Sequence, residues 1–131
     1  MAYEIAGYAV RLTLVAGADL SALQYYFVKL NGSGQAVACA AATDQPIGVL
    51  QNTPISGAEA TVVVVGGTKL VVNGAIAVSK PLGTNATGKG DIKIPGTDTT
   101  EYTVGVAVTA SSADADLITA IINCASPTRA A

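Results

Sequence analysis

The chain contains an internal echo that is typical of a repeated β-structure. A short apolar segment, Ile47 to Leu50, is followed by Ser-Gly-Ala-Glu-Ala and then by the β-branched run Thr61 to Val65. Near the C-terminus, Val104 to Ala107 is followed by Ser-Ser-Ala-Asp-Ala and then by the apolar run Leu117 to Ile122. Each copy has the pattern of two short strands joined by a turn of small residues. The echo predicts a β-hairpin or corner used twice, and it favours a scaffold over a catalytic loop.

Short strand signals continue through the rest of the chain. Tyr25 to Leu30 and Gln35 to Ala40 flank Asn31-Gly32-Ser33-Gly34, and Asn-Gly between two such runs is a strong hairpin signal. A further pair of short strands is expected between Thr68 and Ser79, divided at Asn73-Gly74. About ten short strands and almost no helix result, so the predicted fold class is all-β, a small barrel-like module or a sandwich.

The two chain ends and one internal segment are expected to differ from this β-rich body. Residues 1–15 are predicted to form an N-terminal arm and first strand, residues 16–124 the β-rich domain, and residues 125–131 a frayed, flexible tail. Residues 80–100 are rich in Pro, Gly, Thr, Asn and Asp, which predicts a surface loop containing one short strand around Ile92 and Ile94. The segment from Asp19 to Gln24 is expected to be a loop or a single turn.

The composition indicates a surface that is largely covered. Charged residues make up 12% of the chain, about half of the usual ~25%, while hydrophobic residues reach 50%. No apolar run approaches the roughly 20 residues that a membrane span requires, so no membrane partner is expected. Because interface cores are depleted in charge, we expect copies of the chain or a larger partner to cover much of the surface. The N-terminus has no signal-peptide pattern, which favours an intracellular product.

The charges and cysteines argue against several other classes. A net charge of −2 with seven scattered Lys and Arg residues provides no basic patch, so no direct nucleic-acid partner is expected. Cys39 and Cys124 lie far apart in sequence in small-residue apolar settings, which favours two buried, inert thiols; a disulfide is the alternative.

The motifs that could support catalysis or ligand binding are incomplete. Gly83 to Lys89 matches seven positions of the phosphate-binding loop pattern, but Gly90 stands where a Ser or Thr hydroxyl is needed, so a glycine-rich turn is favoured. The chain has no histidine, and neither cysteine has a basic neighbour in sequence that would activate it. Asp114 and Asp116 form a close pair of carboxylates that could bind a cation weakly, but a solvated turn is favoured. We therefore expect no enzyme, no metal site and no cofactor.

The N-terminal segment is the candidate contact region. Tyr3, Ile5 and Tyr8 are large apolar groups at a chain end, and Val10 and Leu12 continue the alternation. Two interpretations are open. The segment can pair into the sheet of its own domain, or it can add a strand to a neighbouring molecule.

Taken together, these features resemble the capsid decoration, or cement, proteins of tailed bacteriophages. The resemblance runs from about Leu14 to Ile122 and is carried by small and β-branched motifs. These are Ala16-Gly17-Ala18-Asp19-Leu20, Gly48-Val49, Gly57-Ala58-Glu59-Ala60-Thr61-Val62-Val63-Val64, Gly66-Gly67-Thr68-Lys69-Leu70-Val71-Val72 and Val104-Gly105-Val106-Ala107.

The resemblance implies a fold similar to the β-tulip type and a structural role without enzymatic activity. It implies a homotrimer that binds the major capsid protein at three-fold or quasi-three-fold positions of the expanded head. The protein would be made in the bacterial host cytoplasm and would end on the outer capsid surface of the virion. By the same resemblance the arm, here Ala2 to Val15, would contact the shell, with Tyr3, Ile5, Tyr8, Val10 and Leu12 as the contact residues.

Two other function classes compete with this one. A β-rich module of a phage tail or surface adhesin would bind a receptor or glycan, for which exposed aromatic side chains are expected, and the chain has only six aromatics. A hydrolase or transferase would need a base and a nucleophile within hydrogen-bond reach, and the chain offers no convincing pair.

Overall fold

The computed structural model describes residue 2 and residues 9–130, and these residues form strands, turns and loops without a helix. Since no helix occurs in this part of the chain, none is long and apolar enough to cross a membrane. The strands are β1 (Val10–Val15), β2 (Phe27–Leu30), β3 (Ala36–Ala38), β4 (Gly48–Leu50), β5 (Glu59–Val71), β6 (Pro81–Thr84), β7 (Gly90–Ile92), β8 (Tyr102–Thr103), β9 (Gly105–Ala107), β10 (Leu117–Asn123) and β11 (Thr128–Arg129).

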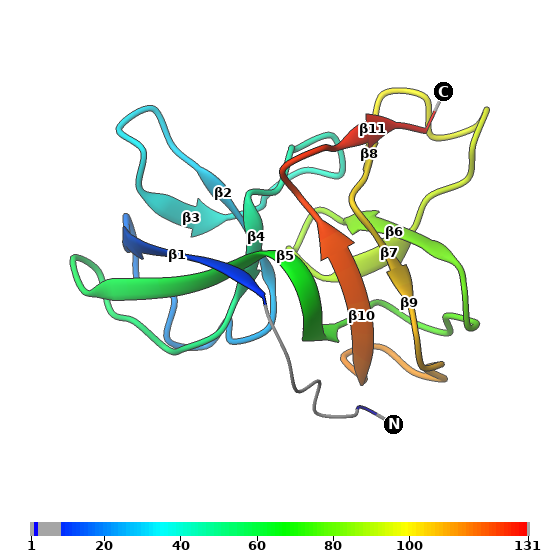
Figure 1. Ribbon diagram of the computed structural model, residues 1–131, viewed down its shortest axis with the longest axis horizontal. Coiled ribbons are helices and arrows are strands. Elements are labelled where there is room, and N and C mark those ends of the chain that lie inside the picture. Colours follow the sequence, from blue (N-terminus) through cyan, green and yellow to red (C-terminus); the bar gives the residue numbers. More distant parts are fainter. Residues whose placement is uncertain (1, 3–8, 131) are drawn as a thin grey trace.

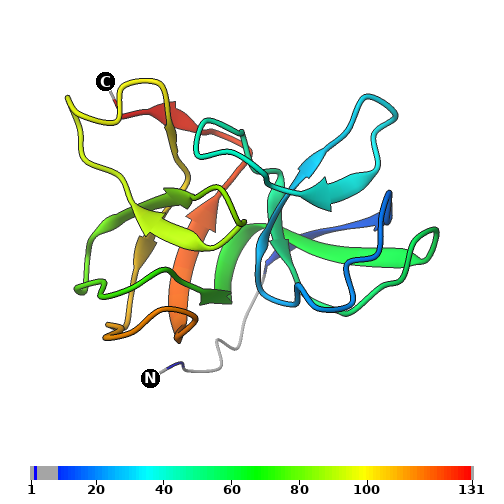
Figure 2. The same cartoon turned by 180° about the vertical axis from the view of Figure 1, so that it is seen from behind.

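Nine of the strands form one antiparallel sheet. The order is β3-β2-β4-β5-β10-β9-β6-β7, with β1 also paired to β5, while β8 and β11 form a separate two-stranded sheet. The large sheet curls without closing on itself (Figures 1 and 2). The predicted all-β, barrel-like class is confirmed, in the form of an open, curled sheet.

The large sheet consists of two repeats that share β5. Read from the ends of the sheet inward, the order β3-β2-β4-β5 on one side matches β7-β6-β9-β10 on the other. The match includes the first strand of each repeat, because β1 pairs with the first half of β5 as the second half of β5 pairs with β10. We call residues 10–65 the N-terminal repeat and residues 66–123 the C-terminal repeat. In Figure 1, β5 (green) runs from the part that holds β1 to β4 into the part that holds β6 to β10.

The pairing registers of the two repeats agree residue by residue. Val49 pairs with Phe27 and Val63 in the N-terminal repeat, and Val106 pairs with Pro81 and Ile121 in the C-terminal repeat. Two isolated parallel bridges also match, since Ala16 pairs with Ala36 and Val72 with Gly90. The sequence echo is therefore the visible part of a repeat that extends over the whole sheet.

The backbone strain of the two repeats matches as well. Positive φ angles occur at Tyr25 (68°) and at the equivalent Ser79 (69°). Tyr25 donates its N–H to the carbonyl oxygen of Leu50, the last residue of β4, at 2.7 Å, and Ser79 donates to that of Ala107, the last residue of β9, at 2.8 Å. A left-handed conformation is uncommon for residues with a side chain, so its recurrence at equivalent positions supports a common origin of the two halves.

Two hydrophobic clusters lie on opposite faces of the N-terminal repeat. The smaller cluster is the interior of that repeat and contains Ala16, Leu20, Val28, Ala36, Leu50, Ala60 and Val62. The larger cluster joins Phe27, Val49 and Val63 to residues of the C-terminal repeat such as Leu82 and Ile122. Because successive strand residues point to opposite faces, strands β2, β4 and β5 supply both clusters. This explains why their sequences are nearly continuous apolar runs.

Several local predictions are confirmed and three are wrong. The hairpin across Asn31 to Gly34 is present as β2 and β3, and both copies of the echo are antiparallel pairs. The predicted pair of strands between Thr68 and Ser79 is wrong, because β5 continues through Gly66-Gly67 to Val71 and residues 73–79 form no strand. Residues 66–71 pair with β10, and this long-range pairing keeps the strand continuous through two glycines that would be expected to interrupt it.

The other two corrections concern segments that we expected to be irregular. Residues 80–100 contain the β6–β7 hairpin, whose Leu82 and Thr84 are fully buried, in place of a surface loop with one strand. The C-terminal segment, expected to be a frayed tail, contains β11. Its pairing with β8 is extended by a hydrogen bond from Ala130 N to Glu101 O at 3.0 Å, and the Arg129 guanidinium lies 5.2 Å from the ring centre of Tyr102.

Candidate interaction surfaces and polar sites

Strand β1 is an exposed edge of the sheet. Among the described residues it pairs with β5 alone, so the backbone groups on its other side are unpaired with any strand. Val10 and Val15 are about half exposed, at 55% and 47%. An exposed apolar edge strand is a template for pairing with another chain. This edge is the part of the predicted contact region that the structure describes.

The predicted contact residues divide between described and undescribed parts of the chain. Tyr3, Ile5 and Tyr8 lie outside the described residues, whereas Val10 and Leu12 belong to β1. The register shifts between Val10 and Arg11, so that Val10 lies opposite Val65 and Leu12 opposite Val62. Val64 of β5 is skipped in this pairing, so a bulge in β5 lies opposite the step from Val10 to Arg11.

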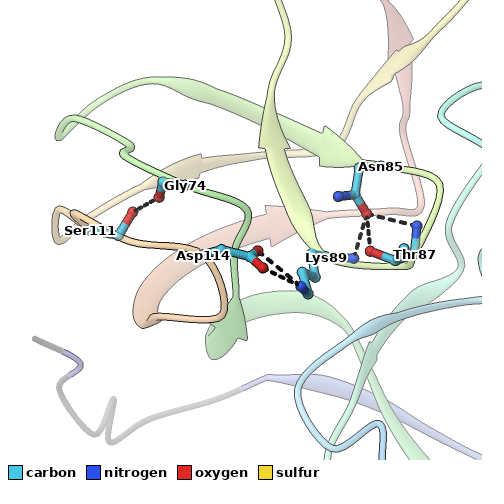
Figure 3. Close-up of polar contacts among 6 residues, drawn as sticks. All are labelled: Gly74, Asn85, Thr87, Lys89, Ser111 and Asp114. Carbon is cyan, nitrogen blue, oxygen red and sulfur yellow. Dashed lines mark hydrogen bonds and ion pairs between the residues drawn. The ribbon is translucent and has the colours of Figure 1, made fainter.

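The glycine-rich motif at residues 83–89 is a hairpin turn with its polar groups internally bonded (Figure 3). The side-chain oxygen of Asn85 accepts hydrogen bonds from Thr87 N at 2.9 Å and Lys89 N at 3.0 Å. Gly88 has φ 83°, which a residue with a side chain rarely adopts. Asn31 makes the same two bonds, to Ser33 N and Gln35 N, in the equivalent turn of the N-terminal repeat. The interpretation as a turn is therefore confirmed, and the motif has a structural role in both repeats.

The carboxylates of the second echo turn are also engaged within the protein. Asp114 accepts two hydrogen bonds from Lys89 Nζ, at 2.9 and 3.0 Å, which ties the β9–β10 turn to the β6–β7 turn (Figure 3). This ion pair raises the pKa of Lys89. Asp116 instead accepts Ser112 N and Ala113 N, and these backbone bonds lower its pKa. The two carboxylates of the predicted pair thus have separate partners.

The two cysteines are free and buried in the larger hydrophobic cluster. Burial raises the pKa of each thiol to about 12. Since the thiolate is the reactive form, both groups are unreactive at neutral pH. The predicted buried, inert thiols are confirmed.

A buried ion pair between Lys93 and Glu101 was not predicted from the sequence. Lys93 directly follows β7, and its side chain is only 2% exposed, with Nζ bound to Glu101 Oε1. No sequence signal marks this pair, because the two residues are eight positions apart, with Lys93 in the segment expected to be a loop and Glu101 just after it. The pair joins the edge of the large sheet to the segment that enters β8. Its position indicates a structural role.

The described residues contain neither a recognisable small-molecule pocket nor a group of three or more Cys, Asp or Glu residues that could hold a metal ion. The described surface exposes large apolar side chains on the β1 edge and on the outer side of β9 and β10, where Val106 and Ile121 are 36% and 51% exposed. These features are suited to contacts with other proteins.

Comparison with known proteins identifies the fold. No protein-family model matches the sequence, and a search of characterised proteins finds no similar one. Among solved structures, the chain is similar to the head fiber gp8.5 N base of bacteriophage phi29, with a TM-score of 0.61 and 19% sequence identity. The match covers 89% of this chain and 96% of that chain. At this identity the likeness establishes a shared fold, and that fold occurs in a protein of a phage head, as the resemblance to phage head proteins implied.

Proposed function

We propose that the chain is a structural virion protein, without enzymatic activity, that decorates and stabilises the expanded head of a phage. It binds the major capsid protein from the outer surface, as a homotrimer at three-fold or quasi-three-fold positions. The observation that carries the proposal is the shared fold with a phage head-fiber base over nearly the full length of both chains.

Two properties of the molecule support this role. Charged residues are scarce, which suits a protein whose surface is covered in an assembly. The β1 edge offers unpaired backbone groups and exposed apolar side chains to an extended segment of another protein. Many such contacts repeated over a symmetric shell resist internal pressure through multivalency, even when each contact is weak.

The test is co-sedimentation of the purified protein with expanded, undecorated heads over a range of concentrations. Saturation at a copy number that matches the three-fold sites is expected, with no binding to isolated coat subunits. Deletion of residues 2–8 is expected to weaken binding at least tenfold. No pelleting above background would overturn the proposal, and binding to host cells without heads would favour a tail or adhesin module.

Two matched substitutions locate the contact on the β1 edge. Val10 and Ile94 are equally exposed, at 55% and 54%, but Ile94 lies between β7 and β8 and away from the β1 edge. Val10→Asp is expected to weaken head binding at least tenfold, whereas Ile94→Asp leaves it unchanged. Equal effects of the two substitutions would show that the β1 edge is not the contact.

A further inference from the structure

The exposed apolar side of the C-terminal repeat can be compared with the equivalent side of the N-terminal repeat. Val49 and Val63 are a cross-strand pair in the N-terminal repeat, and Val106 and Ile121 are the equivalent pair in the C-terminal repeat. The first pair is 0% and 1% exposed, whereas the second is 36% and 51% exposed. Equivalent apolar pairs therefore have opposite environments.

The structure shows what covers the first pair. Val49 and Val63 belong to the larger hydrophobic cluster, which also contains Leu82, Val104 and Ile122 of the C-terminal repeat. The backbone fixes the same contact, because Phe27 N donates to Gly88 O at 2.8 Å and Cys124 N donates to Val64 O at 2.9 Å. In the N-terminal repeat this face is thus the interface between the two repeats.

The C-terminal repeat has no third repeat to cover the same face. We call this surface the β9–β10 face and define it by Val106, Val108 and Ile121, with Val78 on the neighbouring turn. Val78 and Val108 are also exposed, at 56% and 38%. Ile121 lies opposite Gly67 of β5, and the absent side chain of that glycine leaves the isoleucine open to solvent.

We propose that a second copy of this chain covers the β9–β10 face, and so gives it the cover that the C-terminal repeat gives to the equivalent face of the N-terminal repeat. Within one chain, the equivalent face of the N-terminal repeat is already covered by a β-module of the same type, the C-terminal repeat. The proposal that the complete assembly is a trimer rests on the proposed function, whereas the identity of the face rests on the repeat.

The charge pattern of the face favours a copy of the same chain as the partner. Residues 105–108 and 117–122 contain no Asp, Glu, Lys or Arg. A contact among identical copies around a symmetry axis brings the same surface together, and an uncharged surface does so without like-charge repulsion. The β1 edge, by comparison, carries the exposed Arg11. A standard interface buries about 800 Å² per partner, so polar residues around the four apolar side chains must complete the contact.

The test compares Ile121→Asp with Ile55→Asp by sedimentation velocity. Ile55 is 65% exposed and lies in the β4–β5 connection, away from the β9–β10 face, so it controls for adding a charge to an exposed isoleucine. We expect the natural chain and Ile55→Asp to sediment as oligomers, and Ile121→Asp as a folded protomer of about one third of the mass. A natural chain that is monomeric at all concentrations, or an Ile121→Asp variant that stays oligomeric, would overturn the proposal.

A gentler substitution guards against misfolding. Both natural cysteines are buried, so Ile121→Cys and Ile55→Cys each introduce a thiol that a maleimide can reach selectively. We expect labelling at position 121 to slow at least tenfold as concentration rises and copies associate, while labelling at position 55 does not change. Equal labelling of both sites in the oligomer would refute the face as the interface.

These outcomes are separable from those of head binding. A monomeric chain that still saturates expanded heads would refute the β9–β10 interface and leave the decoration role intact. An oligomer that fails to bind heads would refute the decoration role and leave the β9–β10 interface intact.

Discussion

The equivalence of the two repeats predicts that one chemical change has different costs at two matched positions. Val49 and Val106 occupy the same place in their repeats, and both can be replaced by alanine. Each replacement removes two methyl groups, and burying a methylene contributes about 0.8 kcal/mol. At Val49, which is 0% exposed, the transfer loss is about 1.6 kcal/mol, and the cavity that remains raises the cost to about 2–3 kcal/mol.

At Val106 the same replacement costs less. This side chain is 36% exposed, so only about two thirds of the transfer loss applies and solvent fills the space, for a cost of about 1 kcal/mol. Urea denaturation followed by far-ultraviolet circular dichroism measures both free energies of unfolding. It is done at the lowest workable protein concentration, because association of copies would add to the Val106 value. Costs that agree within about 0.5 kcal/mol would refute the assignment of Val49 to the interface between repeats.

Three further predictions concern the core, the buried ion pair and a close backbone contact. Burial raises the pKa of Cys39 and Cys124 to about 12, above the unfolded value of about 8.5. Their contribution to stability is therefore complete below pH 8.5 and falls as pH rises toward 12, by about 2 kcal/mol per thiol over two pH units. Unfolding at pH 8 and pH 10 should show this loss in the natural chain but not in a double alanine variant. Glu101→Gln leaves Lys93 buried without its partner and should cost about 3 kcal/mol in chemical denaturation, and adding Lys93→Met should recover most of that loss. Gly48→Ala places a methyl group against the carbonyl oxygen of the paired strand and should lower the melting temperature by several degrees, whereas an unchanged melting temperature would contradict the close packing of β4 on β5.

The sequence predicted the all-β class and the hairpins because turn chemistry and alternation are local. Asn-Gly at Asn31 and the small-residue turns of the echo fix short-range structure that needs no distant partner. The same reasoning failed at Gly66-Gly67, where two glycines that read as a break lie inside a continuous strand. Pairing of residues 66–71 with β10 holds that strand together, and such long-range pairing leaves no local signal.

The full repeat was hidden for a related reason. The last two strands of each copy keep similar residues, whereas other equivalent positions differ in chemistry, as with Phe27 and Pro81 or Tyr25 and Ser79. Such pairs lie in the same backbone geometry but are covered to different degrees, so their side chains have diverged. Register and hydrogen bonds reveal what the sequence comparison could not.

Of the two candidate surfaces, one was predicted from the sequence and the other was not. Exposed apolar residues at the start of the chain were predicted as contacts, and Val10 is indeed exposed on an edge strand. The β9–β10 face was not predicted, because the sequence pattern identified Val106 and Ile121 only as parts of short apolar strands. Their exposure depends on which face of the sheet another element covers, and that is a property of the assembled fold.

Electron cryomicroscopy of expanded heads saturated with the protein would show where the copies bind and how they are oriented. We expect added density at the three-fold or quasi-three-fold positions, into which three copies fit with their β9–β10 faces toward one another and their β1 edges toward the shell. Heads without added density, or single copies bound away from these positions, would contradict it.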